Sequence, residues 1–326
     1  MVIRFLEKLS SETASINTII PMLLISTNKN YPTRTELTKK VSSLYGSSLG
    51  TSNNKLSDVQ IMALDASCIR NEYALEGESV TEDIVKILLD CIFNPVIENG
   101  GFALKEFDIR KKELKDMIDA QINNKRGYAI KQANEIIFRD EPFSINAYGT
   151  KECAEKLDAV LTYKAFQNIL ETSQIEITVA GGGDLNASVE LIKEAFTNNI
   201  NRKFVSGQTF ISASPIKPEP EYKTEIVEMN QCKMVMAYKG DCSNIYVAKL
   251  MSAILGGTAF SKLFTNVREK LSLCYYCAAR IVDGKSVLII DSGVDKDKIK
   301  LAQKSINEQL EDIANGKLTN DEINNT

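Results

Sequence analysis

The sequence predicts the same order of strands and helices on both sides of a proline-containing segment, and this repeat constrains the fold more than any single motif. Three of the seven prolines fall between positions 215 and 220. Because proline fixes φ and has no backbone N–H, such a cluster favours an extended linker. A chain of 326 residues can hold two domains. We therefore expect a first domain at 1–204, a linker at 205–221 and a second domain at 222–326.

In the first half, the spacing of apolar residues predicts a strand, a helix, a strand and a helix at 16–26, 35–45, 59–69 and 81–93. The apolar residues of the last helix recur on one face, namely Ile84, Ile87, Leu88, Cys91 and Ile92. Further elements are then expected: a charged helix at 105–123, a helical stretch near 128–138, a segment near 157–170, a strand at 174–180 and a helix at 187–198.

The second half repeats the plan. A helix that ends at Gly256 and Gly257, as a glycine C-terminus should, is expected to place four apolar residues on one face, namely Val247, Leu250, Met251 and Ile254. The other expected elements are strands at 224–228 and 233–238, a helix around 263–267, strands at 273–281 and 286–292, and an amphipathic helix at 295–314.

The repeat predicts an α+β fold of two homologous α/β sandwich domains, each a mixed sheet with helices packed on one face. Residues 319–326 are typical of the cap and first turn of a second charged helix. We therefore expect the second domain to be truncated, by roughly a hundred residues when compared with the first.

Charge and hydropathy limit the partners of the chain. The formal net charge of −4 argues against nucleic acid, because phosphate contacts need clustered Lys and Arg. One basic run, Arg110–Lys112, lies beside Asp108 and Glu113 and is interpreted as a solvated helix face. No apolar run is long enough for a membrane span; the longest, 19–25, contains a proline and indicates a strand. The first residues lack the pattern of a signal peptide, so we expect a cytoplasmic location.

The cysteines are odd in number and scattered, which is typical of reduced thiols used as small apolar residues. The only C-x-x-C, Cys274 to Cys277, falls in a predicted strand. On a regular strand, residues three apart point to opposite faces, so we expect these two sulfurs to diverge and to hold no metal. The seven cysteines are Cys68, Cys91, Cys153, Cys232, Cys242, Cys274 and Cys277.

The chain contains no histidine. This excludes a zinc site of two His and a Glu, and equally the Ser-His-Asp and Cys-His mechanisms, because no other side chain normally titrates near neutrality to act as the base. A site of four carboxylates, or of Cys and Asp, remains open on composition, but no local clustering indicates one. We therefore expect no metal or other cofactor and no catalytic residue.

A glycine run, Gly181–Gly183, follows a predicted strand and opens a predicted helix. A nucleotide-binding enzyme that uses this turn is one alternative. The run is neither G-x-G-x-x-G nor a Walker A loop, and Asp184 places negative charge where a phosphate would bind. The favoured interpretation is a tight turn with Asp184 or Asn186 as the helix cap.

The segment 255–275 contains Leu-Gly-Gly, Ser-Lys-Leu-Phe, Arg-Glu-Lys and Leu-Cys-Tyr in this order. It resembles the second-domain signature of the insulinase/pitrilysin family of inverzincin zinc metallopeptidases. The resemblance implies that Arg268 and Tyr275 hydrogen-bond substrate near the scissile carbonyl, where a cation and a phenol stabilise oxyanion charge or hold a peptide. The alternative is an arginine paired with an acid and a tyrosine packed in the sheet.

The first half resembles the same family in Gly46–Leu49, in the strand at 59–69, in Phe93-Asn-Pro and in the charged helix. Active members carry H-x-x-E-H on a helix directly after the first strands. Here residues 26–35 lead almost directly into the helix that normally follows, so we expect the zinc helix to be deleted. The third zinc ligand should fall near Asp116 or Met117, and the register favours Met117.

The resemblance implies a noncatalytic bacterial subunit, comparable in kind to the empty subunit of mitochondrial processing peptidase. In that family two similar halves close around an unfolded peptide. We therefore expect a peptide-binding chamber. It is formed by a heterodimer with a zinc-motif-bearing homologue, or by a homodimer of this chain. The enzyme alternatives are an active metallopeptidase with unconventional ligands and the nucleotide-binding enzyme.

Overall fold

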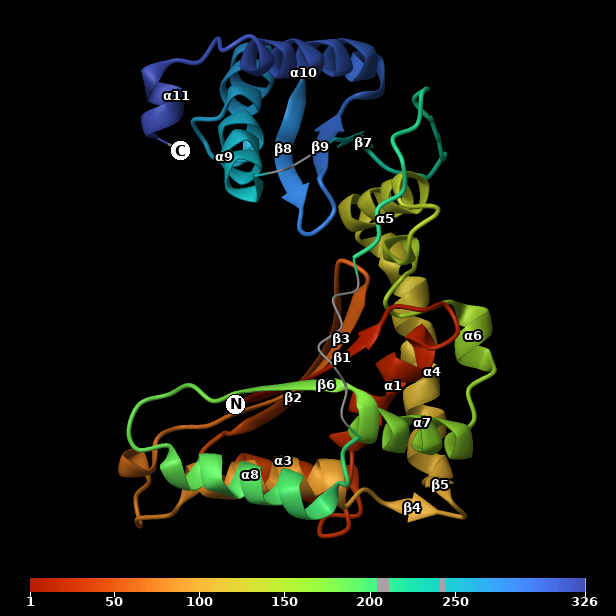
Figure 1. Ribbon diagram of the computed structural model, residues 1–326, viewed down its shortest axis with the longest axis vertical. Coiled ribbons are helices and arrows are strands. Elements are labelled where there is room, and N and C mark those ends of the chain that lie inside the picture. The colour runs from red at the N-terminus through yellow and green to blue at the C-terminus, as the bar shows by residue number, and fades with distance from the viewer. Residues whose placement is uncertain (204–210, 241–243, 326) are drawn as a thin grey trace. The chain divides into compact units, whose positions relative to one another are not determined.

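The computed structural model describes residues 1–203, 211–240 and 244–325 (Figure 1). The strands form sheets of four, two and three strands, and every pairing between described strands is antiparallel. The α+β class is confirmed, but the predicted mixed sheets are wrong. Helices between strands usually indicate parallel crossovers, whereas here β2–β3 and β8–β9 pair as hairpins.

The described residues divide into two compact units. The first unit consists of Met1–Asp119 and the described residues from Ile145 to 203, and the second of Ala120–Ser144 and the described residues from Ile211 onward. The segment before Ile145 therefore packs with the second unit, although it precedes the expected linker. That linker, 205–221, lies partly outside the described residues, and the domain bounds drawn from the repeat stay a prediction.

The first unit is built on the four-stranded sheet, in the order β2-β3-β1-β6. Its elements are β1 (Val2–Lys8), α1 (Ala14–Leu24), α2 (Arg34–Ser43), β2 (Ser48–Leu56), β3 (Val59–Ser67), α3 (Val80–Phe93), β4 (Ile97–Glu98), β5 (Gly101–Phe102), α4 (Leu104–Ala120), α6 (Lys151–Glu155), α7 (Ala159–Thr172), β6 (Gln174–Thr178) and α8 (Asn186–Asn199), with a 3-10 turn at Asn71–Tyr73.

One face of this sheet is apolar, and helices pack on that face only (Figure 1). Ile3 lies opposite Leu64 and Phe5 opposite Met62, and the four side chains are buried. The five apolar residues predicted on one face of α3 are also buried in this core. Alternation in the strands and helical spacing in α3 therefore predicted this layer correctly.

The apolar stretch 16–26 forms most of helix α1, so the predicted strand is wrong. Nearly every residue of α1 is buried, including Pro21 within it. A segment that is buried on nearly all sides has no solvent-facing polar stripe to reveal its period, and such a run does not distinguish a buried strand from a buried helix. Sequence reasoning also missed β2, because its polar residues Ser48–Leu56 lie at the edge of the sheet and need little burial.

The second unit is built on the three-stranded sheet, in the order β7-β9-β8. Its elements are α5 (Lys125–Ile137), β7 (Cys232–Lys239), α9 (Ile245–Gly256), a π-helical segment (Leu263–Lys270), β8 (Cys274–Val282), β9 (Val287–Val294), α10 (Ile299–Ala314) and α11 (Asn320–Asn324), with 3-10 turns at Gln121–Asn123, Pro142–Ser144 and Lys296–Lys298. The strand predicted at 224–228 is absent from the described residues, which are irregular there.

Both faces of this sheet are covered, which corrects the expectation of helices on one face. Leu288 and Ile290 of β9 pack in a core with residues of α9 and α10. Val287 and Ile289, which alternate with them, pack against Phe138 at the end of α5. The face predicted for α9 is also wrong in part, because Val247 and Leu250 are exposed while Ala248, Ser252 and Leu255 are buried.

A buried carboxylate lies beside the α5 side of the same sheet. The Glu141 side chain is 1% exposed and accepts hydrogen bonds from the ammonium groups of Lys239 and Lys285, the latter at 2.8 Å, and from Ser214. Burial raises the pKa of Glu141, but the hydrogen bonds outweigh it and lower the pKa to about 2. These charges fasten β7 and the β8–β9 hairpin to the segment that follows α5.

Candidate functional site

Helix α1 lies between β1 and α2, the place where active insulinase-type peptidases carry their zinc helix. The sequence predicts a strand here and deletion of the zinc helix; the structure has a helix at this place, and the deletion itself stays a prediction. The helix is present, but its sequence, Ala-Ser-Ile-Asn-Thr-Ile-Ile-Pro-Met-Leu-Leu, contains no histidine, carboxylate or cysteine. α1 therefore offers no side chain of the types that usually bind zinc.

The polar residues of α1 form a closed network of neutral groups with the sheet. Asn17 donates its amide to Gln60 Oε1 at 2.9 Å, and Asn53 donates to Thr18 Oγ1 at 2.6 Å. Gln60 Nε2 in turn donates to Asn53 Oδ1 at 3.1 Å and to the Ala147 carbonyl at 2.7 Å. Asn17, Thr18 and Gln60 are each at most 3% exposed. We call Asn17, Thr18, Asn53 and Gln60 the amide network; it joins α1 to β2 and β3 without any ion.

Helix α4 would supply the third zinc ligand. Both candidate positions, Asp116 and Met117, are exposed. The link between α4 and the end of α1 is Arg110, which donates to Ser26 Oγ at 2.7 Å and is 8% exposed, so its interpretation as part of a solvated face is wrong. Across the described residues, no group of three or more Cys, Asp or Glu side chains could hold a metal ion.

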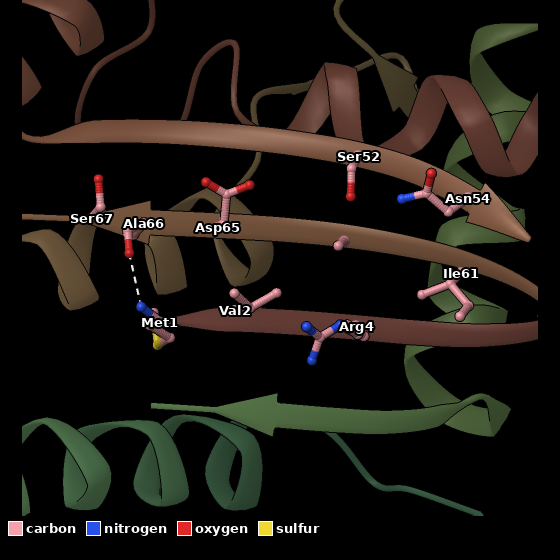
Figure 2. A pocket seen from close by; sticks show the side chains of 10 residues that line it. Met1, Val2, Arg4, Ser52, Asn54, Ile61, Asp65, Ala66 and Ser67 are labelled. Atoms are coloured by element: carbon pink, nitrogen blue, oxygen red, sulfur yellow. Dashed lines mark hydrogen bonds between the residues drawn. The ribbon is translucent and has the colours of Figure 1, made fainter. Parts of the chain in front are cut away.

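The other face of the four-stranded sheet is open and carries polar and apolar side chains side by side. Figure 2 shows Ser52 and Asn54 of β2, Asp65 of β3 and Arg4 of β1 on this face. Arg4 donates to Thr178 Oγ1 of β6 at 3.2 Å. A depression of about 500 Å³ runs over these side chains. Its size suits part of an extended chain, whose carbonyl and amide groups such polar side chains can bind.

In the second unit, Arg268 lies on the π-helical segment Leu263–Lys270. Its guanidinium stacks on the Phe264 ring at 4.6 Å and has a loose ion pair with the adjacent Glu269 at 3.5 Å. The side chain is 40% exposed. Both contacts leave the N–H groups of Arg268 able to donate. Stacking on Phe264 does not use them, because they lie in the plane of the guanidinium, and the ion pair with Glu269 is exposed to solvent.

Tyr275 occupies a β-bulge in β8. Cys274 lies opposite Val294 and Tyr276 opposite Gly293, so Tyr275 between them has no partner on β9. A bulge re-aims the extra side chain away from the regular faces of the sheet. Tyr275 is accordingly 58% exposed, and the alternative in which it packs in the sheet is wrong.

The same bulge overturns the expectation that Cys274 and Cys277 point apart. Cys277 lies opposite Ser292, two residues from Val294, so both cysteines face the core between the sheet, α9 and α10. They are 8% and 7% exposed, and the two neighbouring thiols shift each other's pKa, that of Cys274 downward and that of Cys277 upward. A period-2 count could not find this, because one extra residue inverts the alternation.

After the glycine turn, a neighbouring side chain accepts a backbone N–H at the start of α8. The Asp184 carboxylate accepts the N–H of Asn186, the first residue of α8, at 2.9 Å. The expected cap at Asp184 or Asn186 is wrong, because the N-cap of α8 is Leu185, which makes no side-chain cap hydrogen bond; Asp184 contributes from the residue before it. A Cβ on Gly182 would meet Arg70 Nη1 at 2.8 Å, so this glycine is explained by a close side chain.

Sequence reasoning identified Arg268 and Tyr275 but missed the amide network. A signal existed, since Asn17 and Thr18 interrupt an otherwise apolar run, and Gln60 stands at an inward position of β3. Buried polar groups need hydrogen-bond partners, so polar residues at inward positions of neighbouring elements are expected to bond to each other. Among the described residues, no helix combines the length and the apolar character that crossing a bilayer requires.

Comparison with known proteins is consistent with this geometry. Residues 142–326 match the family Peptidase M16 inactive domain. The probable inactive metalloprotease YmfF of Bacillus subtilis is 22% identical over 330 residues, which cover 100% of this chain and 77% of that protein. An uncharacterized zinc protease of the same species, YmxG, is 23% identical over 187 residues, or 55% of this chain and 43% of that protein. The crystal structure of a conserved protein from Enterococcus faecalis V583 is 27% identical, with a TM-score of 0.87, and covers 99% of this chain and 76% of that one.

Proposed function

The chain belongs to the M16 (insulinase) peptidase family, and we propose that it acts as a noncatalytic subunit that forms a peptide-binding chamber with a zinc-bearing homologue. One observation carries the proposal. Arg268 and Tyr275 are exposed with free hydrogen-bonding capacity, while α1 of the same chain has no zinc-ligand side chain. The chain therefore keeps the two side chains that would hold a peptide and has no zinc-ligand side chain on α1 that would help to cleave it.

A peptide can bind at the edge of the sheet in the second unit. Within the described residues, β8 is an edge strand, so its outer backbone groups can pair with an extended peptide. Tyr275 projects from this edge, where its hydroxyl can donate to a peptide carbonyl. Arg268, on the segment that precedes β8, adds a positive charge that can bind the carbonyl oxygens of the same peptide. In the first unit, the outer edge of β2 and the open face around Arg4 and Asp65 offer a second surface of the same kind.

The comparisons support the choice of partner. Bacillus subtilis contains one relative named a probable inactive metalloprotease and another named a zinc protease. Two chains of the same family, one with and one without a metal site, can pair through pseudo-symmetric surfaces as homologous subunits do. A homodimer is the other arrangement that this surface permits.

Co-expression of the chain with the H-x-x-E-H homologue encoded in the same genome tests the proposal. The tagged chain should retain that homologue through size-exclusion chromatography, and the pair should bind a fluorescent unfolded peptide. Absence of both association and peptide binding would overturn the proposal. Chelator-sensitive cleavage by the chain alone would support the unconventional metallopeptidase, and thermal stabilisation by nucleotides would support the nucleotide-binding enzyme.

A further inference from the structure

We propose that Cys274 and Cys277 are a redox-modification site, a dithiol that small disulfides convert into an intramolecular disulfide and that small thiols restore. This goes beyond peptide holding and does not depend on it. The inference stands on the bulge in β8, which brings the two thiols onto one face of the strand.

The separation of the two positions suits a disulfide. Their partners on β9, Val294 and Ser292, are two residues apart and share a face. Such positions on an extended strand lie about 6.7 Å apart, at the upper end of the Cα separation of about 6.8 Å that a disulfide spans. Both side chains also lie in the same apolar core between the sheet, α9 and α10, so the two sulfurs share one environment in the reduced protein.

The environment gives the two thiols different roles. The neighbouring Cys277 thiol lowers the pKa of Cys274, and the positive charge of Arg268 adds to this against the effect of burial. The neighbouring Cys274 and burial raise the pKa of Cys277. Cys274 is therefore the thiolate that attacks first, and Cys277 is the thiol that resolves.

The chemistry balances with one small disulfide, RSSR, as oxidant. The Cys274 thiolate attacks one sulfur of RSSR, which forms a mixed disulfide and releases RS⁻. Cys277 then loses its proton to solvent and attacks the Cys274 sulfur, which closes the protein disulfide and releases a second RS⁻. Two protein thiols are oxidised, RSSR is reduced to two thiols after protonation, and the new ring encloses Tyr275 and Tyr276.

Cys91 and Cys153 lack this arrangement. Cys91 is fully buried, and burial raises its pKa to about 12. Cys153 is partly exposed, and its sulfur lies near the Ser11 carbonyl. Cys153 can take up a mixed disulfide, whereas Cys91 should resist reaction, so the two serve as internal controls.

The test uses the full folded chain and oxidised glutathione. After acid quenching, denaturation and alkylation, trypsin releases residues 271–280, which contain Cys274 and Cys277 and no other cysteine. We expect this peptide to lose two hydrogens and to carry no alkyl group, and dithiothreitol added before the quench should restore two alkylated thiols. The peptide 87–105 should keep Cys91 as an alkylated thiol.

Single variants assign the order of attack. Cys277→Ser should retain one glutathione on Cys274, whereas Cys274→Ser should retain none on Cys277. The proposal is overturned if residues 271–280 keep two alkylated thiols under conditions that glutathionylate Cys153. It is equally overturned if each cysteine of the folded wild-type chain carries its own glutathione.

Discussion

The Asn17 side-chain amide donates to Gln60 Oε1 at 2.9 Å and joins α1 to β3 inside the first unit. Both residues are buried, and Gln60 is completely so. The helix itself contributes no charged side chain to this contact. Here the amide network satisfies its own donors and acceptors, so the helix remains attached to the sheet although no ion attracts it.

The amide network should contribute measurably to stability. Gln60→Leu keeps the approximate volume of the side chain but leaves the Asn17 amide, the Asn53 oxygen and the Ala147 carbonyl without this partner. We expect the free energy of unfolding to fall by about 3 kcal/mol, since each unsatisfied buried group costs about 1–3 kcal/mol. Urea denaturation measures the loss. Gln174→Leu, on the exposed edge strand β6, is the matched control; an equal effect of the two substitutions would contradict a role for the network.

The folded chain should be indifferent to metal removal. Since α1 contains no ligand residue and the network is neutral, neither a chelator nor added zinc should change the midpoint of thermal unfolding. Differential scanning fluorimetry, together with metal analysis of the purified chain, checks this. A zinc-bearing homologue treated in parallel should lose stability with chelator. Stoichiometric zinc in this chain would disprove the expectation.

Stability should fall in acid through Glu141. Its pKa is lowered to about 2 in the folded protein, below the ordinary value of 4.5, because the hydrogen bonds from Lys239 and Lys285 outweigh burial. A depressed carboxyl pKa stabilises the fold above the ordinary value, and this contribution is lost as the pH falls toward the folded value. The stabilisation at pH 7 amounts to about 3 kcal/mol.

Glu141→Gln isolates this contribution. The difference in unfolding free energy between the wild type and Glu141→Gln should be largest above about pH 5 and should shrink between about pH 4.5 and 2. Urea titrations at a series of pH values measure it. Glu308→Gln, at an exposed pair with Lys304 at 3.9 Å, should show almost no difference at any pH. A pH-independent deficit in Glu141→Gln would mean that packing, and not charge, holds this cluster.

The sequence predicts helices and strands whose apolar residues repeat with one regular period. It does not predict elements that depart from such a period. β3, α3 and α10 alternate or repeat regularly, and their predicted bounds agree with the structure to within a few residues. α1 is buried on nearly all sides, its few polar residues included, and has no readable period. The bulge at Tyr275 adds one residue to β8, which reverses the predicted faces of Cys274 and Cys277. The packing of α5 with the second unit depends on distant contacts such as the hydrogen bonds of Arg126 to Asp291, one of them at 3.1 Å, which no local pattern encodes.

Tyr275 should contribute to peptide binding through its hydroxyl. Tyr275→Phe keeps the ring and the bulge but removes the donor, so the affinity for a fluorescent unfolded peptide should fall about fivefold, or about 1 kcal/mol, the net worth of one hydrogen bond. Arg268→Ala should weaken binding further because a charged donor is lost. Tyr246→Phe on α9 removes the hydroxyl of another exposed tyrosine and should leave the affinity unchanged. Fluorescence anisotropy with the assembled pair of chains measures all three. If Tyr275→Phe and Tyr246→Phe bind alike while the wild type binds peptide, the peptide is held elsewhere, and the open face around Arg4 and Asp65 becomes the surface to mutate next.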